Sequence, residues 1–339
     1  MVYMSNVFIP ENYKSLLSSG ETQAAIVLIK RTFETRLAKA LNLVRVSAPL
    51  FVETSTGYND NLSGSERPVA FDIKETGTEA QIVHSLAKWK RHALHQYKFA
   101  PYAGLYTDMN AIRRDEEMDN IHSIYVDQWD WEQVITRESR NIPYLKKTVR
   151  GIVNALCGTL AVCQKAFPAL NAVNIEKKVT FVTSQRLEQL YPDLQPNMRE
   201  KEFTRKYKTV FVIGIGGRLK SGVKHDNRAP DYDDWDLNGD LIVWNPVLER
   251  AFELSSMGIR VDSEALLKQL KISGCENRLA FPFHKALASG ELPLTMGGGI
   301  GQSRTCMLIM NKAHIGEVQV SVWDAETLRK CAGAGIELL

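Results

Sequence analysis

Apolar residues recur at steps of three and four within residues 21–41, as on one face of a long helix: Ile26, Ile29, Phe33, Leu37 and Leu41. Ser18, Ser19 and Gly20 stand just before this segment, where a helix start is expected. The next segment, LVRVSAPLFV (43–52), predicts a strand. Because the Pro49 nitrogen cannot donate a hydrogen bond, we expect this strand at an edge or an interface.

Several later segments show patterns typical of strands. VAFDI (69–73) and AQIVH (80–84) flank a loop of hairpin length that contains Gly77. Extended structure ending near Arg260 is expected in LERAFELSSMGIRV. Further strands are predicted at KVTFVTS (178–184), TVFVIGIGG (209–217), DLIVWNP (240–246) and, last in the chain, HIGEVQVSVW (314–323).

Helical patterns lie between these strands. They cover LAKWKRHALHQY (86–97), residues 144–166, a segment capped by Asp262, and FHKALAS, which stops at Gly290. The length suggests roughly two domains, but the chain shows no repeat, low-complexity segment or flexible linker. We therefore predict an α+β fold with one mainly antiparallel sheet flanked by helices, formed by residues 21–339 after an amino-terminal extension, 1–20.

HSIYVDQWDWEQ (122–133) is the strand with the most unusual alternation. Because side chains alternate along a strand, Val126, Gln128, Asp130 and Glu132 share one face. The opposite face carries Tyr125, Asp127, Trp129 and Trp131. A polar row on a central strand needs polar groups to contact, so this face is a candidate binding site.

Composition narrows the class of protein. The 339 residues are 44% hydrophobic and 24% charged with a net charge of +3, so no overall field attracts nucleic acid or a membrane. The amino terminus lacks the pattern of a signal peptide, and the longest apolar run (24–29) is too short to span a membrane. Five cysteines without a C-x-x-C pair suit reduced thiols. We expect a soluble cytoplasmic enzyme.

GGGIGQSR (297–304) places four glycines before Arg304. A dinucleotide-binding pattern would need glycine where Arg304 stands, and a P-loop would need Lys where Gln302 stands before Ser303. A glycine turn between a strand and a helix is the simplest remaining interpretation.

Positions 1, 3, 5 and 6 of a calcium-binding EF-hand loop are matched by Asp234, Asp236, Asn238 and Gly239, but the twelfth position is Asn245 rather than Glu. The charged stretch 220–234 is better interpreted as a mobile surface loop. A metal site at His92 and His95 lacks further ligands, so a solvated helix face is the simpler interpretation there.

Three segments together resemble the signature motifs of class II aminoacyl-tRNA synthetases. ALNLVRVSAPLF (40–51) resembles motif 1, the dimer-forming element. IRRDEEMDNIHSIYVDQWDWE (112–132) resembles motif 2, and GGGIGQSR resembles motif 3. The longer blocks NDNLSGSERPV, VHSLAKWKR, RAPDYDDW and LNGDLIVWNPVLERAFELSSMGIRVD are similar to the asparagine synthetase A family, the ammonia-dependent, AMP-forming enzymes built on the same catalytic fold.

The resemblance implies the reaction L-aspartate + ATP + NH₃ → L-asparagine + AMP + diphosphate, through a β-aspartyl adenylate. It implies catalytic roles for Arg113, Arg304 and Lys90. It also implies contacts to aspartate from Asp60, Ser85, Gln128, Asp130, Ser256 and Arg260, and contacts to ATP from Arg113, Arg228, Asp233, Asp240, Glu253 and Arg304. Asp240 and Glu253 would hold Mg²⁺, and Arg228 and Asp233 would lie on a lid. A homodimer through residues 21–50 is implied as well.

Two other functions stay open at this point. An aspartyl- or asparaginyl-tRNA synthetase would share the motifs, although KWKRH (88–92) is the only basic run that is a candidate for contact with tRNA. A non-catalytic relative could act as an amino-acid sensor, but it would have less need of Arg113, Glu253 and Arg304 together. Relative to bacterial members of the family, we expect this chain to have a short loop after Trp235 and extra residues at its amino terminus.

Overall fold

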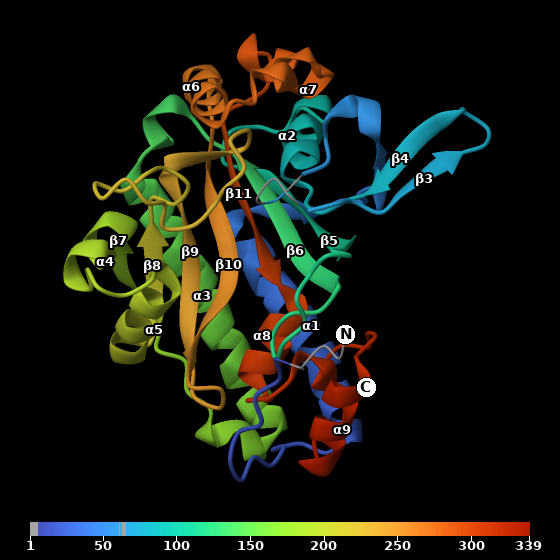
Figure 1. Ribbon diagram of the computed structural model, residues 1–339, viewed down its shortest axis with the longest axis vertical. Coiled ribbons are helices and arrows are strands. Elements are labelled where there is room, and N and C mark those ends of the chain that lie inside the picture. Colours follow the sequence, from blue (N-terminus) through green and yellow to red (C-terminus); the bar gives the residue numbers. More distant parts are fainter. Residues whose placement is uncertain (1–5, 61, 63–65) are drawn as a thin grey trace.

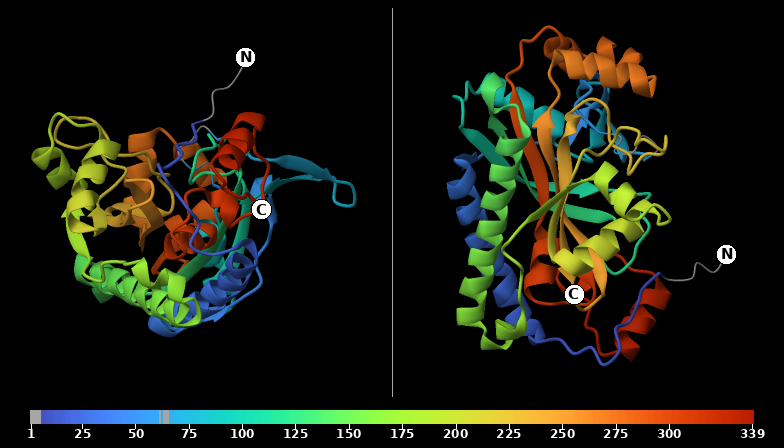
Figure 2. Two further views of the ribbon diagram at one scale, coloured as in Figure 1. Left: turned by 90° about the horizontal axis from the view of Figure 1, so that it is seen from below. Right: turned by 90° about the vertical axis from the view of Figure 1, so that its left-hand side faces the viewer.

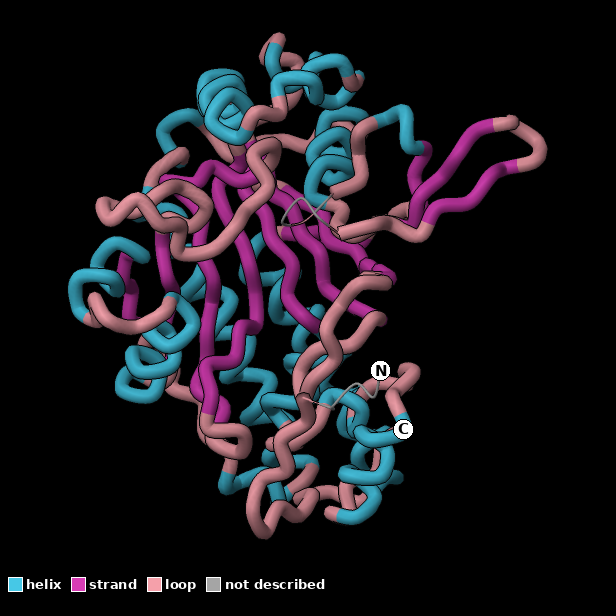
Figure 3. Tube along the Cα trace, viewed as in Figure 1, coloured by secondary structure: helices cyan, strands magenta, loops and turns pink. Residues whose placement is uncertain are grey.

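An eight-stranded sheet crosses the middle of the molecule in the computed structural model, which describes residues 6–60, 62 and 66–339 (Figures 1 and 3). Residues 1–5 of the expected extension, and positions 61 and 63–65 of the NDNLSGSERPV block, lie outside the described residues. The strand order is β1 (Leu43–Arg45), β5 (Gly104–Ile112), β6 (Tyr125–Val134), β11 (Thr295–Gly301), β10 (Arg250–Arg260), β9 (Asp233–Asn245), β8 (Thr209–Ile213) and β7 (Thr180–Thr183).

Only the outermost pairs of this sheet, β1 with β5 and β7 with β8, are parallel; all the pairs between them are antiparallel. The predicted α+β class and the predicted edge position of the strand before Pro49 are therefore confirmed. A second, three-stranded sheet contains β2 (Phe51–Glu53), β4 (Thr78–Ile82) and β3 (Ala70–Ile73). Its β3–β4 hairpin projects from the body, and Gly77 turns it with a φ of +66°.

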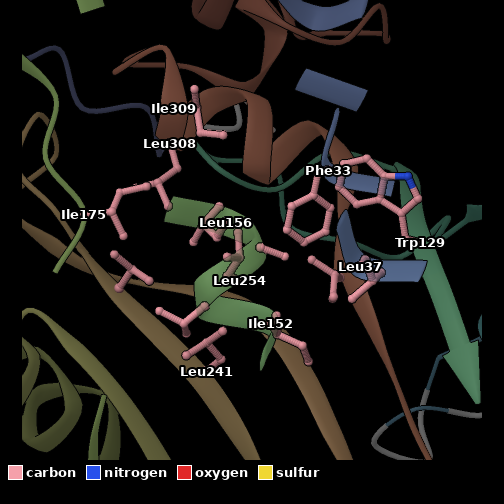
Figure 4. Close-up of a cluster of buried hydrophobic side chains, with 14 of the residues drawn as sticks. Phe33, Leu37, Trp129, Ile152, Leu156, Ile175, Leu241, Leu254, Leu308 and Ile309 are labelled. Carbon is pink, nitrogen blue, oxygen red and sulfur yellow. The ribbon is translucent and has the colours of Figure 1, made fainter. Parts of the chain in front are cut away.

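Three helices cover one face of the main sheet: α1 (Ser19–Leu41), α3 (Ile142–Ala166) and α8 (Gln302–Ile309). Figure 2 shows α1 and α3 running side by side along this face. Ser18 and Glu21 form a capping box that starts α1, which satisfies backbone donors that a helix start leaves free. The predicted apolar face of α1 enters the core, where Phe33 contacts Trp129 of β6 with ring centroids 4.6 Å apart (Figure 4).

The opposite face is covered at its β7–β9 side by α4 (Ser184–Leu190) and α5 (Pro196–Tyr207), through Leu187 and Phe203. At one end of the sheet lie α2 (Ala87–Gln96), α6 (Ser263–Ser273) and α7 (Pro282–Ala288) (Figure 1). The helices α4 and α5 were not predicted. This arrangement leaves β6, β11 and β10 facing a space between helices rather than a second helical layer.

The predicted strand at 314–323 is wrong. A short 3₁₀ turn occupies Ile315–Glu317, and no strand follows it before α9 (Ala325–Gly333), an unpredicted helix. His314 Nδ1 accepts a hydrogen bond from the Gly316 amide at 3.0 Å, and the Glu317 carboxylate accepts from the amides of Ala313 and His314. Local side-chain caps therefore satisfy backbone groups that a strand would need for pairing.

Within residues 6–60, 62 and 66–339, no helix is both long enough and apolar enough to span a membrane.

We predict that His314 makes folding pH-dependent. Burial lowers the pKa of His314 to about 4, although Asp119 and Asp324 oppose the shift. The unfolded chain therefore binds a proton between about pH 6.5 and pH 4 that the folded chain does not bind. Stability is lost as the pH falls through this range.

Substituting His314→Asn keeps an acceptor for the Gly316 amide and removes the titration. Between pH 7 and pH 5 the wild type should lose about 2 kcal/mol more unfolding free energy than the variant, measured by urea titration at both pH values. Equal losses in the two proteins would show that the folded and unfolded chains bind a proton at His314 equally, so that burial does not lower its pKa.

Candidate functional site

A cavity of about 400 Å³ opens on the face of β6, β10 and β11 that α1 and α3 leave free, a size typical of small-molecule sites. Most residues predicted for the site line this cavity: Ser85, Arg113, Gln128, Asp130, Arg228, Asp233, Glu253, Ser256, Arg260 and Arg304. Lys90, Asp60 and Asp240 are buried and contact residues of the lining from behind. One cavity thus collects side chains as far apart in the chain as Ser85 and Arg304.

The glycine run is the central strand of the site rather than a turn. In β11, Gly297 pairs with Glu132 of β6 and Gly299 pairs with Asp130. A Cβ at Gly297 would overlap the Glu132 carboxylate, and one at Gly299 would overlap the Gln128 amide. The interpretation as a turn is therefore wrong: the missing side chains make room for polar side chains of β6 to lie across β11.

A buried group of charges fills one end of the site. Lys90 of α2 contacts the Asp130 carboxylate, donates to the Trp131 carbonyl at 2.9 Å and lies 3.7 Å from Glu132. Arg260 of β10 donates to Glu132 at 2.7 and 3.0 Å, and also contacts Asp233 of β9. We call these five residues, Lys90, Asp130, Glu132, Asp233 and Arg260, the buried charge group.

Burial and pairing shift the pKa values of two carboxylates of the buried charge group in opposite directions. Burial acts to raise the pKa of Glu132, but Arg260 and Lys90 outweigh it and the pKa is lowered. Burial raises the pKa of Asp233, because Arg260 offsets it only in part. Glu132 was placed on the polar face by its alternation but given no role; its contact to Arg260, 128 residues away, carries no local sequence signal.

Helix α2 supplies several of the cations behind the site. Lys88 lies 3.2 Å from Asp231, and Arg91 donates to the carbonyls of Val261 and Pro293 at 2.7 and 2.9 Å. Together with Lys90, these residues are almost fully buried. These three charges belong to KWKRH, the only candidate for tRNA contact in the sequence, and they lie inside the protein.

The prediction of a mobile charged loop is wrong for its last part. The Asp231 carboxylate is fully buried and contacts Lys88, Arg278 and His284, the last two at 2.8 Å. Burial acts to raise the pKa of Asp231, but these cationic partners hold it far below its usual value. The EF-hand interpretation is excluded as well, because its residues lie along strand β9.

Two further residues at the cavity wall have few hydrogen-bond partners. Asp60 is buried, and one carboxylate oxygen accepts the Leu62 amide at 3.0 Å. The second oxygen has no hydrogen-bond partner among the described residues. Burial raises the pKa of Asp60. Ser85 Oγ accepts from the Ala87 amide at 3.2 Å, which orients the hydroxyl at the start of α2.

Two arginines face the other end of the cavity. Arg113 follows β5 and lies 3.7 Å from Glu116, and its Nε is buried without a partner in the described part of the chain. Arg304 lies in the first turn of α8 and donates to the Glu253 carbonyl at 2.9 Å, with 19% of its side chain exposed. Guanidinium groups with unused donors around one cavity suit an anionic ligand such as a phosphate.

The start of α8 is itself fixed by β6. Asp127 accepts from the Ser303 amide at 3.0 Å and from its hydroxyl at 2.9 Å, and Lys30 of α1 lies 3.1 Å from the same carboxylate. Asp127 thus caps the helix that carries Arg304. It was predicted to lie on the face opposite Gln128, but this function was missed because Ser303 is 176 residues away.

Asp240 and Glu253 lie on either side of one hydroxyl. Ser256 Oγ is 2.6 Å from Asp240 and 3.2 Å from Glu253, and Arg228 contacts Asp240. Burial raises the pKa of Asp240 to about 7 despite Arg228, and the charge of Glu253 adds to the rise. Two neighbouring carboxylates fit a hard cation such as Mg²⁺, which protein sites bind through one or two carboxylates together with phosphates. Within the described residues, no cluster of three or more His, Cys, Asp and Glu side chains forms an all-protein metal site.

Comparisons with known proteins agree on one family. The model of a family described as aspartate-ammonia ligase matches residues 20–335. The aspartate–ammonia ligase of Clostridium perfringens (strain SM101) is 57% identical over 337 residues, which cover 99% of this chain and 100% of the relative. That of Lactobacillus johnsonii is 53% identical over 335 residues, 98% of this chain and 99% of the relative.

The fold is shared more widely. The asparaginyl-tRNA synthetase of Entamoeba histolytica superposes with a TM-score of 0.64 at 13% identity, over 89% of this chain and 67% of that one. The asparaginyl-tRNA synthetase of Pyrococcus horikoshii complexed with asparaginyl-adenylate gives a TM-score of 0.64 at 13% identity, over 88% and 68%. The class II synthetase fold is therefore confirmed.

We predict that Glu132→Gln destabilises the protein by about 3 to 5 kcal/mol, because Arg260 and Lys90 would keep their buried charges with one fewer counter-charge. The matched control is Asp236→Asn, which removes an exposed carboxylate from β9 of the same sheet. Urea titrations of both variants give the free energies of unfolding. A loss for Glu132→Gln as small as that of the control would contradict the assigned pairing.

Proposed function

This chain belongs to the aspartate–ammonia ligase family, and we propose that it makes asparagine from aspartate, ammonia and ATP through a β-aspartyl adenylate, releasing AMP and diphosphate. The observation that carries the proposal is one cavity with two different ends. The buried charge group borders one end, and two arginines face the other: Arg113, whose Nε has no partner among the described residues, and Arg304. An amino acid and a nucleotide triphosphate need these two environments side by side.

Aspartate brings two carboxylates and an ammonium group, so its site needs both signs of charge. Asp130, Gln128 and Asp60 offer acceptors for the ammonium group, and Arg260 offers donors for a carboxylate. Ser85 and Ser256 add hydroxyl groups. Lys90 is 0% exposed and contacts Asp130, so its proposed contribution to catalysis is to hold Asp130 in place rather than to touch substrate.

ATP is placed along the other end of the cavity. Arg113 contacts the α-phosphate and Arg304 contacts the nucleotide and its outer phosphates, through charge-assisted hydrogen bonds. Asp240 and Glu253 would hold Mg²⁺, which neutralises phosphate charge when bound. Arg228 contacts Asp240, and Asp233 contacts Arg260. Arg228 therefore acts on the ATP end by orienting Asp240, and Asp233 acts on the aspartate end by orienting Arg260, more than as parts of a mobile lid.

The chemistry needs positioning and charge stabilisation. The side-chain carboxylate of aspartate attacks the α-phosphorus, and diphosphate leaves with the electrons of the broken bond. Negative charge grows on the α-phosphate oxygens during this step, and Arg113 stabilises it. Ammonia then attacks the activated carbonyl, loses a proton and expels AMP, which leaves asparagine.

A homodimer through residues 21–50 is part of the proposal. This element exposes several apolar side chains, Val27, Val44 and Leu50, with Val44 60% exposed. A second copy packed on this segment would bury these exposed apolar side chains. The five cysteines are all free thiols, which supports a reducing, cytoplasmic setting. Identity above 50% to named ligases favours this activity over a tRNA synthetase or a sensor.

The proposed reaction predicts that purified protein with aspartate, ATP, Mg²⁺ and ammonium forms asparagine and AMP in equal amounts, with no added tRNA. Chromatography of the amino acids and nucleotides measures both products. Asparagine formed together with ADP would contradict an adenylate intermediate. A requirement for tRNA would favour the synthetase alternative.

We predict that Gly299→Ala raises the KM for aspartate by about tenfold, because the new Cβ displaces the Gln128 amide and removes about one hydrogen bond to substrate. Stability should change little, because only the end of the flexible Gln128 side chain must move. The matched control is Gly20→Ala in the first turn of α1, where a Cβ meets nothing within 4 Å. An unchanged KM for aspartate in Gly299→Ala would remove Gln128 from the aspartate site.

A further inference from the structure

The segment that joins β5 to β6, residues 113–124, carries Arg113 at its start and is held by the amino-terminal segment of the chain. Its base is closed by a hydrogen bond from the Arg113 amide to the Ile124 carbonyl at 2.8 Å. Ile121, His122 and Ser123 line the cavity, so the position of this segment shapes the end of the site where ATP is placed. We call residues 113–124 the nucleotide loop.

Asn120 connects the nucleotide loop to two other parts of the chain. Its side-chain oxygen accepts from the Phe8 amide at 2.8 Å, and its nitrogen donates to the carbonyls of Phe8 and Ala313 at 2.7 and 2.9 Å. The Asn120 carbonyl accepts from the Ile315 amide at 2.8 Å. Asn120 is 2% exposed, so all these contacts are shielded from water.

The amino-terminal segment is fixed in turn to the residues that follow α8. Tyr13 donates to Glu317 at 3.0 Å, and Lys312 donates to Ser15 and Thr22 at 2.7 and 3.0 Å. The Lys312 amide also donates to the Met307 carbonyl of α8 at 3.0 Å. Val7 belongs to one buried apolar cluster with Cys331 of α9 and Ile336, so the amino-terminal segment lies beside the last residues of the chain.

Through these contacts, Asn120 connects the loop that carries Arg113 to the segment that follows the helix of Arg304. Arg113 starts the nucleotide loop, and Arg304 lies in α8, which leads directly to Ala313 and Ile315. The separation of the two guanidinium groups depends on how the loop sits against the segment after α8. An arginine pair that binds one ligand loses affinity when its spacing fluctuates, because ordering it then costs binding free energy.

We propose that Asn120 is a positioning residue for ATP, and that residues 6–17 act as a brace that fixes the nucleotide loop to the segment after α8. Asn120 does not line the cavity, so it acts through Arg113 and its loop. The proposal rests on the assignment of this end of the cavity to ATP.

The nucleotide loop has other anchors, which is why loss of the brace should loosen it without unfolding it. Asp119 accepts from the Ile121 and His122 amides and from Arg250 at 3.1 Å. Ser123 Oγ lies 2.7 Å from Ser321 Oγ. These bonds do not involve the amino-terminal segment and remain when the brace is removed.

The test uses the fact that Phe8 binds Asn120 through its backbone while 55% of the residue is exposed. Phe8→Pro removes the amide donor, and Phe8→Ala leaves it in place as the matched control. Phe8→Pro and Asn120→Ala should each raise the KM for ATP about three- to tenfold, with a smaller change in the KM for aspartate and in kcat. Phe8→Ala should behave as the wild type.

Because both variants remove the same contact, the double variant should be no worse than Asn120→Ala alone. Hydrogen exchange of residues 113–124 in the full chain without substrates should become faster in Phe8→Pro and Asn120→Ala, and stay unchanged in Phe8→Ala. An unchanged KM for ATP with faster exchange would overturn the proposal, as would equal rises in both KM values or additive effects in the double variant.

The two proposals can fail separately. If the wild type made no asparagine, the proposed function would fall, whereas the exchange data would still report whether the brace holds the loop. If the wild type is active and loop exchange is the same in all variants, the brace alone is refuted.

Discussion

The ion pair between Arg260 and Glu132, with Lys90, Asp130 and Asp233 around it, is the interaction on which the site depends. Removing charges from water is costly unless each finds partners of opposite charge and further hydrogen bonds. Here the partners come from helix α2 and strands β6, β9 and β10, so no single element can satisfy the requirement. The strands must keep their register for the charges to pair, and the same register directs Gln128 and Ser256 into the cavity.

This charge group is possible only because a strand of glycines runs beneath it. The Glu132 carboxylate occupies the space that a side chain at Gly297 would fill, and Gln128 occupies that of Gly299. Met296 and Ile300 of the same strand point into the apolar core. On one face of β11, side chains therefore pack into the core. On the other face, the absence of side chains leaves space for the polar groups of the site, which side chains on both faces of a strand would fill.

Sequence periodicity could predict which side chains share a face, because a strand repeats every two residues: Gln128, Asp130 and Glu132 do lie together. It could not predict partners, since Arg260 meets Glu132 across 128 residues and Asp231 meets His284 across 53. Periodicity also predicted a strand at His314, where local hydrogen bonds stabilise a turn instead. The glycine run was interpreted as a turn, although it forms strand β11. Long-range ion pairs and hydrogen bonds from capping side chains are the two kinds of interaction that a local sequence pattern does not reveal.

The two ends of the cavity are held by interactions of different strength. Charged pairs in the dry interior hold the end assigned to aspartate, and breaking one leaves a buried charge without its partner. The loop that carries Arg113 is held by neutral hydrogen bonds such as those of Asn120 and by a partly exposed ion pair between Asp119 and Arg250, and each of these contributes less. In the proposed reaction the enzyme must keep a reactive acyl group in one orientation while it releases diphosphate and then AMP from the other end. Rigid charge pairing on the amino-acid side and weaker bracing on the nucleotide side meet these two needs within one sheet.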